Sequence, residues 1–145
     1  MNVIIDDMTE GDPEKVARLE KENFTSPWTV NDFSNILSSG DSGCVVARLG
    51  DEIVGCVVYR NILGDVDITN VSVDKRYRRC GIAHKLMRAA LEKGKSIGGE
   101  RFTLEVRATN VAAIKLYESF GFIVEGIRRN FYKYPTEDGL IMWLR

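Results

Sequence analysis

The chain has 145 residues, of which 44% are hydrophobic and 28% are charged, and this length and composition fit one globular domain over residues 1–145. Its 20 basic and 21 acidic residues leave a net charge of -1, which excludes the global basic field of a protein that gathers nucleic acid. No apolar run is long enough to cross a bilayer, and the first residues, MNVIIDDM, lack the features of a signal peptide, so we expect a cytoplasmic protein with no membrane partner.

The N-terminal quarter predicts a short strand followed by two helices. Residues 2–5 (NVII) form an apolar strand, and Asp12 then Pro13 supply the N-cap and the first position of a helix that runs to about Asn23. The SPW tripeptide breaks this helix. A second helix covers residues 30–37, and the polar SSGDSG segment ends it.

Three strands are predicted next, joined by tight turns. They lie at residues 43–49, 52–62 and 66–73. Glycine followed by aspartate stands at both connections, at Gly50 and Gly64, and is typical of a tight turn. These strands form an antiparallel meander.

The C-terminal half mixes helices and strands. Apolar residues recur with a helical period at Ile82, Ala83, Leu86, Met87, Ala90 and Leu91. A strand at residues 101–107 follows, then a helix from the cap Asn110 to Phe120, then strands at 122–132 and 139–144. The resulting order is βααβββαβαββ, an α/β fold built on a mixed sheet.

The three cysteines predict neither a disulfide framework nor a zinc site. Cys44, Cys56 and Cys80 are odd in number, widely spaced and without a CxxC pair. We expect no metal cofactor.

The entrance to the third helix, RYRRCGIAHKLM at residues 76–87, is a candidate phosphate site. A helix N-terminus presents free N–H groups and the positive end of the helix dipole. Gly81 and Ala83 let a ligand approach these groups closely, and Arg78 and Arg79 add flexible cationic arms. The spacing alone fits an ordinary helix start with solvated arginines equally well.

Longer stretches resolve this ambiguity, because they resemble a known family. The segment ITNVSVDKRYRRCGIAHKLM (68–87) is similar to the cofactor-binding segment of the GCN5-related N-acetyltransferases, the GNAT superfamily. LEVRATNVAAIKLYESFGF (104–122), SPW (26–28) and IRRNFYKYP (127–135) resemble the bacterial branch that acetylates the N-terminal alanine of a small-subunit ribosomal protein. The resemblance implies a mostly antiparallel central sheet with helices on both faces.

The resemblance also implies acetyl-CoA as the cosubstrate. The backbone of residues 71–73 would bind the pantetheine arm, the amides of residues 79–84 would wrap the pyrophosphate, and Asn110 would contact the reactive end. The positions carried over are Val71, Ser72, Val73, Arg78, Arg79, Cys80, Gly81, Ile82, Ala83, His84, Asn110 and Tyr117.

Two residues are candidates for catalysis. Glu105 faces away from Leu104 and Val106 in the alternating strand and would accept a proton from the acceptor amine. Tyr117 would donate a proton to the departing thiolate. Without the resemblance, Glu105 reads as an exposed carboxylate paired with Arg107, and Tyr117 as a core tyrosine.

The acceptor is predicted less directly. The resemblance implies a ribosomal protein N-terminus, with Trp28, Tyr132 and Tyr134 as contacts. Phe131 replaces a tyrosine that is common in the branch, which affects the acceptor loop alone. Other acceptors of the same fold remain open, namely other protein N-termini, lysine or small amines, as does a non-catalytic acetyl-CoA-binding module; the sequence makes no prediction of oligomeric state.

Overall fold

The computed structural model describes residues 2–145. Its elements in chain order are β1 (Ile4–Asp7), α1 (Pro13–Asn23), α2 (Val30–Leu37), β2 (Ser42–Leu49), β3 (Glu52–Ile62), β4 (Asp65–Val73), the short 3-10 helix η1 (Lys75–Tyr77), α3 (Ile82–Ser96), β5 (Arg101–Arg107), α4 (Val111–Ser119), β6 (Ile123–Tyr132) and β7 (Glu137–Leu144). The predicted order βααβββαβαββ is confirmed, and η1 is the one addition.

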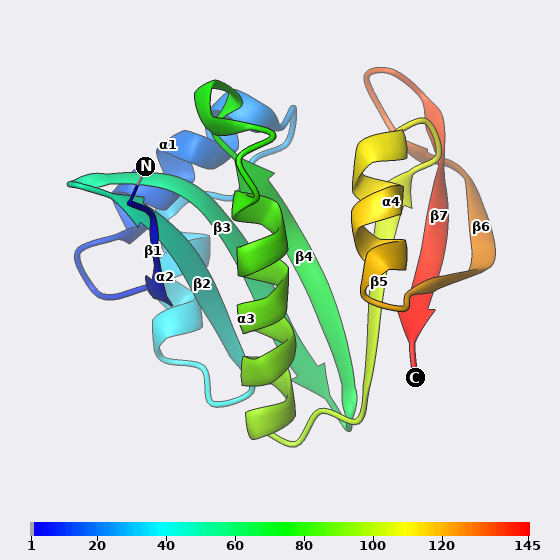
Figure 1. Ribbon diagram of the computed structural model, residues 1–145, viewed down its shortest axis with the longest axis horizontal. Helices are drawn as coiled ribbons and strands as arrows, with labels where there is room; N and C mark the ends of the chain where they lie inside the picture. The colour runs from blue at the N-terminus through cyan, green and yellow to red at the C-terminus, as the bar shows by residue number, and fades with distance from the viewer. Residues whose placement is uncertain (1) are drawn as a thin grey trace.

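The strands form a seven-stranded mixed sheet in the order β1-β2-β3-β4-β5-β7-β6. Only β4 and β5 are parallel, and every other neighbouring pair is antiparallel. Helices α3 and α4 lie in front of the sheet in Figure 1, and α1 and α2 lie behind it. The prediction of a mostly antiparallel sheet with helices on both faces is therefore confirmed.

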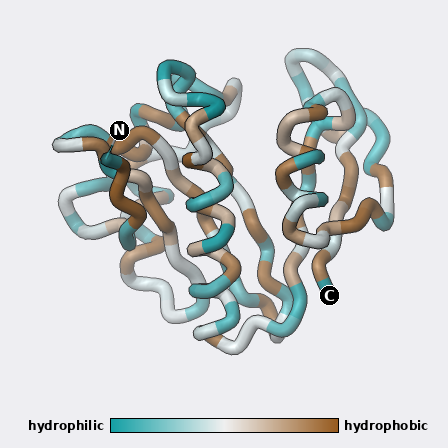
Figure 2. Tube along the Cα trace, viewed as in Figure 1, coloured by the Kyte–Doolittle hydropathy of each residue, from teal (hydrophilic) through white to brown (hydrophobic). Residues whose placement is uncertain are grey.

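Helix α3 packs one apolar side against the front face of the sheet. Its buried residues recur at helical spacing: Ile82, Leu86, Met87, Ala90, Leu91 and Gly94. Of the six predicted apolar positions, Ala83 is the one that is only partly buried. Gly94 brings the helix very close to the sheet, because an added Cβ would lie 2.8 Å from the ring of Phe102 and 3.2 Å from Val66. Figure 2 shows the hydrophobic residues concentrated along the strands and on the sides of the helices that meet them.

Helices α1 and α2 cover a second core on the rear face. Phe33 of α2 and Val16 of α1 are fully buried there against Val46, Cys56 and others of the central strands. A capping box starts α2: the Thr29 hydroxyl accepts from the Asp32 N–H, and the Asp32 carboxylate accepts from the Thr29 N–H. Helices α1 and α2 therefore form one layer behind the central strands of the sheet.

Asp12 has a different role from the predicted one. It occupies the N-cap position of α1, but its side chain makes no capping hydrogen bond. Its carboxylate instead accepts from the Thr9 N–H at 2.7 Å and from both Nη atoms of Arg48, at 2.8 and 2.6 Å. Asp12 therefore ties the start of α1 to β2, a long-range contact that the local capping pattern does not reveal.

Across residues 2–145, no helix is both long and apolar enough to cross a membrane.

We predict that Asp12→Asn weakens the fold in a pH-dependent way. Arg48 lowers the pKa of Asp12 from 3.8 to about 2. A carboxyl whose pKa is lower in the folded state stabilises that state above its unfolded pKa and loses the effect as pH falls through the folded pKa. The variant should lose about 2 kcal/mol of unfolding free energy at pH 7.

Urea denaturation at pH 7, 4 and 2.5 measures the unfolding free energy of the variant and of the unmodified protein. The difference between the two should be largest at pH 7, smaller at pH 4 and small at pH 2.5. Asp51→Asn, the same change at an exposed turn, is the control and should leave stability nearly unchanged. A destabilisation of Asp12→Asn that is equal at all three pH values would contradict the assignment.

Candidate active site

Strands β4 and β5 separate after three paired residues. The pairs are Asp65 with Arg101, Val66 with Phe102, and Asp67 with Thr103. Beyond them the two strands diverge, as Figure 1 shows. Beyond Asp67 the β5-facing edge of β4 therefore has no neighbouring strand, and an extended ligand can bind such an edge as an added strand.

Helix α1 supports β4 from behind at the point where the strand becomes irregular. The register between β3 and β4 shifts between Cys56 and Val58, and Asn70 has a φ of +55°. The Asn70 amide donates to Glu20, which is only 1% exposed. One turn further along α1, Asn23 donates to the Ser72 hydroxyl and to the Val73 carbonyl.

No pattern in the sequence predicted these supports. In the sequence, Glu20 looks like any other carboxylate of a helix. In the structure it is buried, and burial raises its pKa. Its importance comes from Asn70, fifty residues later in the chain. Only the tertiary structure brings the two together.

The loop before α3 fits a phosphate group. Arg79 and Gly81 have φ values of +64° and +77°, and no side chain caps the helix. A positive φ favours glycine, and an added Cβ at Gly81 would meet no atom within 4 Å, so the space before the helix is open. The first-turn N–H groups of α3 are thus available to an anion.

The side chains of this loop differ in what they can contribute. Arg78 is not the flexible arm predicted from the sequence, because its guanidinium donates to the Val73 carbonyl at 3.2 Å and to Asn23 at 3.3 Å. Ile82 is buried and offers only its backbone. His84 stacks on Phe120, the residue that follows α4, with 4.6 Å between ring centroids. The Cys80 thiol is exposed.

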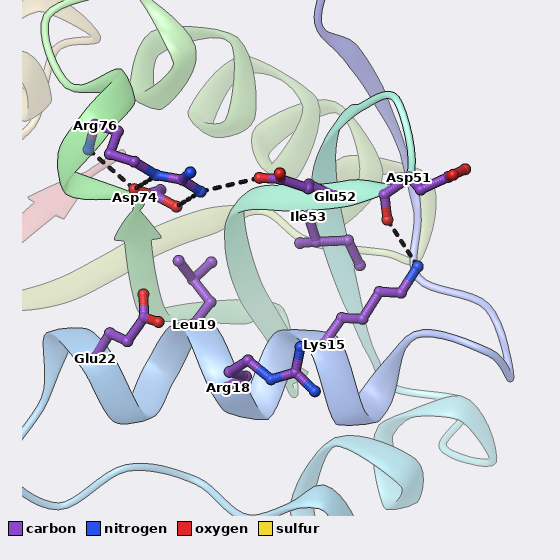
Figure 3. Close-up of a pocket in the computed structure, with 9 residues that line it drawn as sticks. All are labelled: Lys15, Arg18, Leu19, Glu22, Asp51, Glu52, Ile53, Asp74 and Arg76. Atoms are coloured by element: carbon purple, nitrogen blue, oxygen red, sulfur yellow. Dashed lines mark hydrogen bonds and ion pairs between the residues drawn. The ribbon is translucent and has the colours of Figure 1, made fainter.

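An ion-pair network braces η1 just before this loop (Figure 3). Asp74 accepts from the Arg76 N–H at 2.9 Å and from its guanidinium, which also reaches Glu52 at 2.9 Å. These residues line a shallow cleft of about 270 Å³ between α1 and the β2–β3 turn. The network fixes the direction in which the chain enters the phosphate loop.

Glu105 lies on β5 beside the opening between the strands. Its Oε1 is 3.2 Å from Nε of Arg128, so the predicted alternative partner, Arg107, is wrong. Its Oε2 is buried and has no hydrogen-bond partner, the one such side-chain atom among residues 2–145. An unpartnered buried carboxylate oxygen is costly unless a donor reaches it.

Tyr117 lies on α4, which covers the other face of the sheet. It is 6% exposed and packs edge-on against Phe122 at 6.1 Å, as the core-tyrosine reading predicted. Burial raises the pKa of Tyr117 to about 12, and the nearby Tyr132 adds a smaller increase. Its phenol therefore stays protonated at neutral pH.

Arg107 holds the loop between β6 and β7 in place. Its guanidinium donates to the carbonyls of Lys133 at 3.0 Å and Pro135 at 2.9 Å and to Glu137 at 3.1 Å. It also lies 4.5 Å from the ring centroid of Tyr132. Burial and the charge of Glu105 both raise the pKa of the half-buried Tyr132.

The structure places the three predicted acceptor contacts in three different regions. Tyr132 faces the region of Glu105 and Tyr117. Trp28 packs on Phe33 at 5.2 Å and lines a groove on the rear face of the sheet. Tyr134 is 81% exposed at the tip of the loop. Asn110 caps α4 as predicted, its side chain accepting from the Ala113 N–H.

The geometry provides three elements of an acyl-transfer site. An open strand edge and a helix N-terminus can bind a long phosphate-bearing cosubstrate, a carboxylate oxygen is free on the rear face, and a protonated phenol is on the front face. Among the described residues, no group of three or more His, Cys, Asp or Glu side chains is placed to hold a metal ion.

Comparisons with known proteins agree with this geometry. The model of the Acetyltransferase (GNAT) family matches residues 13–122. A [ribosomal protein bS18]-alanine N-acetyltransferase of Salmonella typhimurium is 37% identical, covering 88% of this chain and 86% of the relative. The N-alpha-acetyltransferase RimI of Mycobacterium tuberculosis is 34% identical, covering 97% and 90%.

A solved structure is similar over almost the whole chain. The crystal structure of the ribosomal-protein-S18-alanine N-acetyltransferase from Escherichia coli superposes with a TM-score of 0.88 at 28% identity. The match covers 99% of this chain and 93% of that structure. Fold and sequence comparisons therefore indicate the same family.

We predict that Arg107→Lys loosens the β6–β7 loop. A lysine cannot reproduce the fork that reaches two carbonyls and a carboxylate at once. Hydrogen exchange of the amides in residues 130–138 should become about fivefold to tenfold faster, as expected for the loss of one or two net hydrogen bonds. Arg145→Lys is the matched control, because Arg145 pairs with Glu125 on the surface and contacts no loop carbonyl. Unchanged exchange in Arg107→Lys would contradict the clamp.

Proposed function

The chain belongs to the acetyltransferase (GNAT) family and is an acetyl-CoA-dependent N-acetyltransferase, and we propose that its acceptor is the N-terminal alanine of a small-subunit ribosomal protein. Relatives that cover most of the chain support this acceptor, since their names specify ribosomal protein bS18. We further propose that residues 1–145 act as a single catalytic domain, and that the reaction takes place in the cytoplasm, where ribosomal proteins are made.

The unpartnered Oε2 of Glu105 carries this proposal. An α-amine has a pKa of about 8 and arrives at neutral pH largely as a cation with several N–H donors. Such a group supplies the hydrogen bond that Oε2 lacks and gives up its proton to the same oxygen. Arg128 holds Oε1 and leaves Oε2 as the basic atom.

The acetyl-CoA site follows from the open edge of β4 and the start of α3. The backbone of residues 71–73 binds the pantetheine arm, and the amides of residues 79–84 surround the pyrophosphate, with Arg78 and Arg79 adding positive charge. Asn110 lies at the start of α4, near the reactive end. The brace at Asp74 and the support from Asn23 keep this surface in shape before the cosubstrate binds.

The transfer proceeds by direct attack in a ternary complex. Glu105 first releases to solvent the proton that it took from the ammonium group. The neutral amine nitrogen then bonds to the thioester carbonyl carbon, and the surplus proton of the adduct passes to the regenerated Glu105 carboxylate. Backbone N–H groups of the diverging strand near Val73 stabilise the oxyanion. The carbon–sulfur bond then breaks, and the electron pair leaves on sulfur.

Tyr117 stabilises the departing thiolate. A phenol with a pKa of about 12 is fully protonated at neutral pH and donates a hydrogen bond to sulfur as its charge develops. A thiol with a pKa of about 8.5 is the stronger acid, so complete transfer from this phenol is uphill by several kcal/mol. Tyr117 therefore acts mainly as a hydrogen-bond donor, and the thiolate takes its final proton when product leaves.

Thiol release from acetyl-CoA with a panel of acceptors tests the function. The panel holds a peptide with the alanine N-terminus of the host's own ribosomal protein, the same peptide with a blocked α-amine, an α-blocked peptide with an internal lysine, and spermidine. We expect turnover of the free alanine peptide alone. Turnover of lysine or spermidine instead would overturn the acceptor, and silence across the panel despite acetyl-CoA binding would favour a binding module.

We predict that Glu105→Gln and Tyr117→Phe separate catalysis from binding. Loss of the base should lower kcat by roughly two to four orders of magnitude. Loss of the phenol hydroxyl should lower it by about tenfold to a hundredfold, in line with one charge-assisted hydrogen bond. Binding of acetyl-CoA, followed by calorimetry, should stay within about twofold in both variants, because neither side chain holds the phosphate or the pantetheine arm.

Glu125→Gln is the control, since Glu125 pairs with Arg145 on the surface of the last strands. It should keep full activity. Unchanged turnover in both Glu105→Gln and Tyr117→Phe would show that the catalytic residues are assigned wrongly.

A further inference from the structure

A groove on the rear face of the sheet is not used by the chemistry described above. It has a volume of about 320 Å³ and lies between α2 and the strands β2, β3 and β4. Its walls include Trp28, Val58, Arg60, Asp67 and Thr69. This is the face of the sheet to which the Glu105 side chain belongs.

Asp67 links this groove to Glu105. Asp67 of β4 pairs with Thr103 of β5, so the two side chains share a face. Glu105 is two residues beyond Thr103 on that same face, which makes it the diagonal neighbour of Asp67. Although the strands begin to diverge beyond this pair, the charge of Glu105 still acts on Asp67 and raises its pKa.

The Asp67 carboxylate has no ion-pair or hydrogen-bond partner within residues 2–145, although it is partly buried. Arg60 stands directly opposite it on β3. The Arg60 guanidinium instead reaches Asp41 at the rim, with 3.9 Å between Nε and Oδ2. The groove therefore contains an anion that the protein itself does not pair.

The charges around Asp67 also favour a cation in the groove. Burial and the negative charge of Glu105 both raise the pKa of Asp67, while Arg60 lowers it by less. The Asp67 carboxylate therefore faces the groove near a second negative charge, which Arg60 offsets only in part. A cation placed in the groove would relieve this repulsion.

We propose that the groove is a specificity site for a basic side chain at the second or third residue of the acceptor peptide, with Asp67 as the residue that selects it. The inference rests on the proposed function, because the α-amine must lie at Glu105. An extended peptide advances about 3.3 Å per residue, so a lysine or arginine side chain close behind the terminal alanine reaches Asp67. Trp28 offers an aromatic surface for the same cation.

Peptides that differ at one position test this specificity. Two alanine-initiated peptides carry lysine at position two or three, and each has a counterpart with glutamine there. The measured quantity is the ratio of kcat/KM for lysine over glutamine. We expect a ratio of about five to ten for one of the two positions, in line with a partly desolvated ion pair.

Asp67→Asn should bring that ratio close to one. Because the ratio compares two peptides with one enzyme preparation, a partial loss of folded protein cancels. Asp67→Ser, a smaller side chain, is a second variant that should behave in the same way. Asp51→Asn removes the same charge from the exposed β2–β3 turn and should keep the ratio of the unmodified enzyme.

The outcomes separate this inference from the proposed function. Turnover of all alanine peptides with equal rates for lysine and glutamine overturns the specificity site and leaves the N-terminal acetyltransferase intact. A lysine preference that persists in Asp67→Asn and Asp67→Ser overturns the role of Asp67. Failure of every alanine peptide overturns the proposed acceptor and the specificity site with it.

Discussion

The short pairing between β4 and β5 is the constraint on which the rest of the site depends. The two strands share a parallel ladder for three residue pairs and then diverge. At the closed end, Gly94 lets α3 pack tightly over Val66 and Phe102. At the open end, Glu20 and Asn23 hold β4 in an irregular path around Asn70. Exposed ladder groups need partners from water or from a ligand, so this opening is where the fold is built to bind one.

The opening also lets two faces of the sheet contribute to one reaction. Leu104 and Val106 point into the core below α4, where Tyr117 lies, and Glu105 points to the opposite face. A continuous sheet would isolate these side chains from each other. Because the strands diverge, the proposed roles of Tyr117 on one side and Glu105 on the other can apply to one substrate complex. The cosubstrate and the acceptor can then approach from different directions, as direct transfer in a ternary complex requires.

The sequence predicts what local patterns determine and misses what distant residues determine. Hydrophobic periodicity located the helices and strands, as in the clean alternation of residues 101–107, and capping chemistry placed Asn110 correctly. The same reasoning failed at Asp12, whose carboxylate is taken by Arg48, and at Arg78, which is bound to Val73. A side chain's partner across the sheet depends on register and packing, which no window of the sequence contains.

The ion pair with Arg128 does not account for both carboxylate oxygens of Glu105. If Glu105 served only to pair with Arg128, one oxygen would suffice, and the other would be expected in contact with water. Its Oε2 is instead buried without a donor, which costs about 1–3 kcal/mol in a folded protein. A donor brought by a ligand would recover that energy on binding. Arg128 occupies the other oxygen, so Oε2 is the atom of Glu105 that we propose meets the N–H groups of the acceptor.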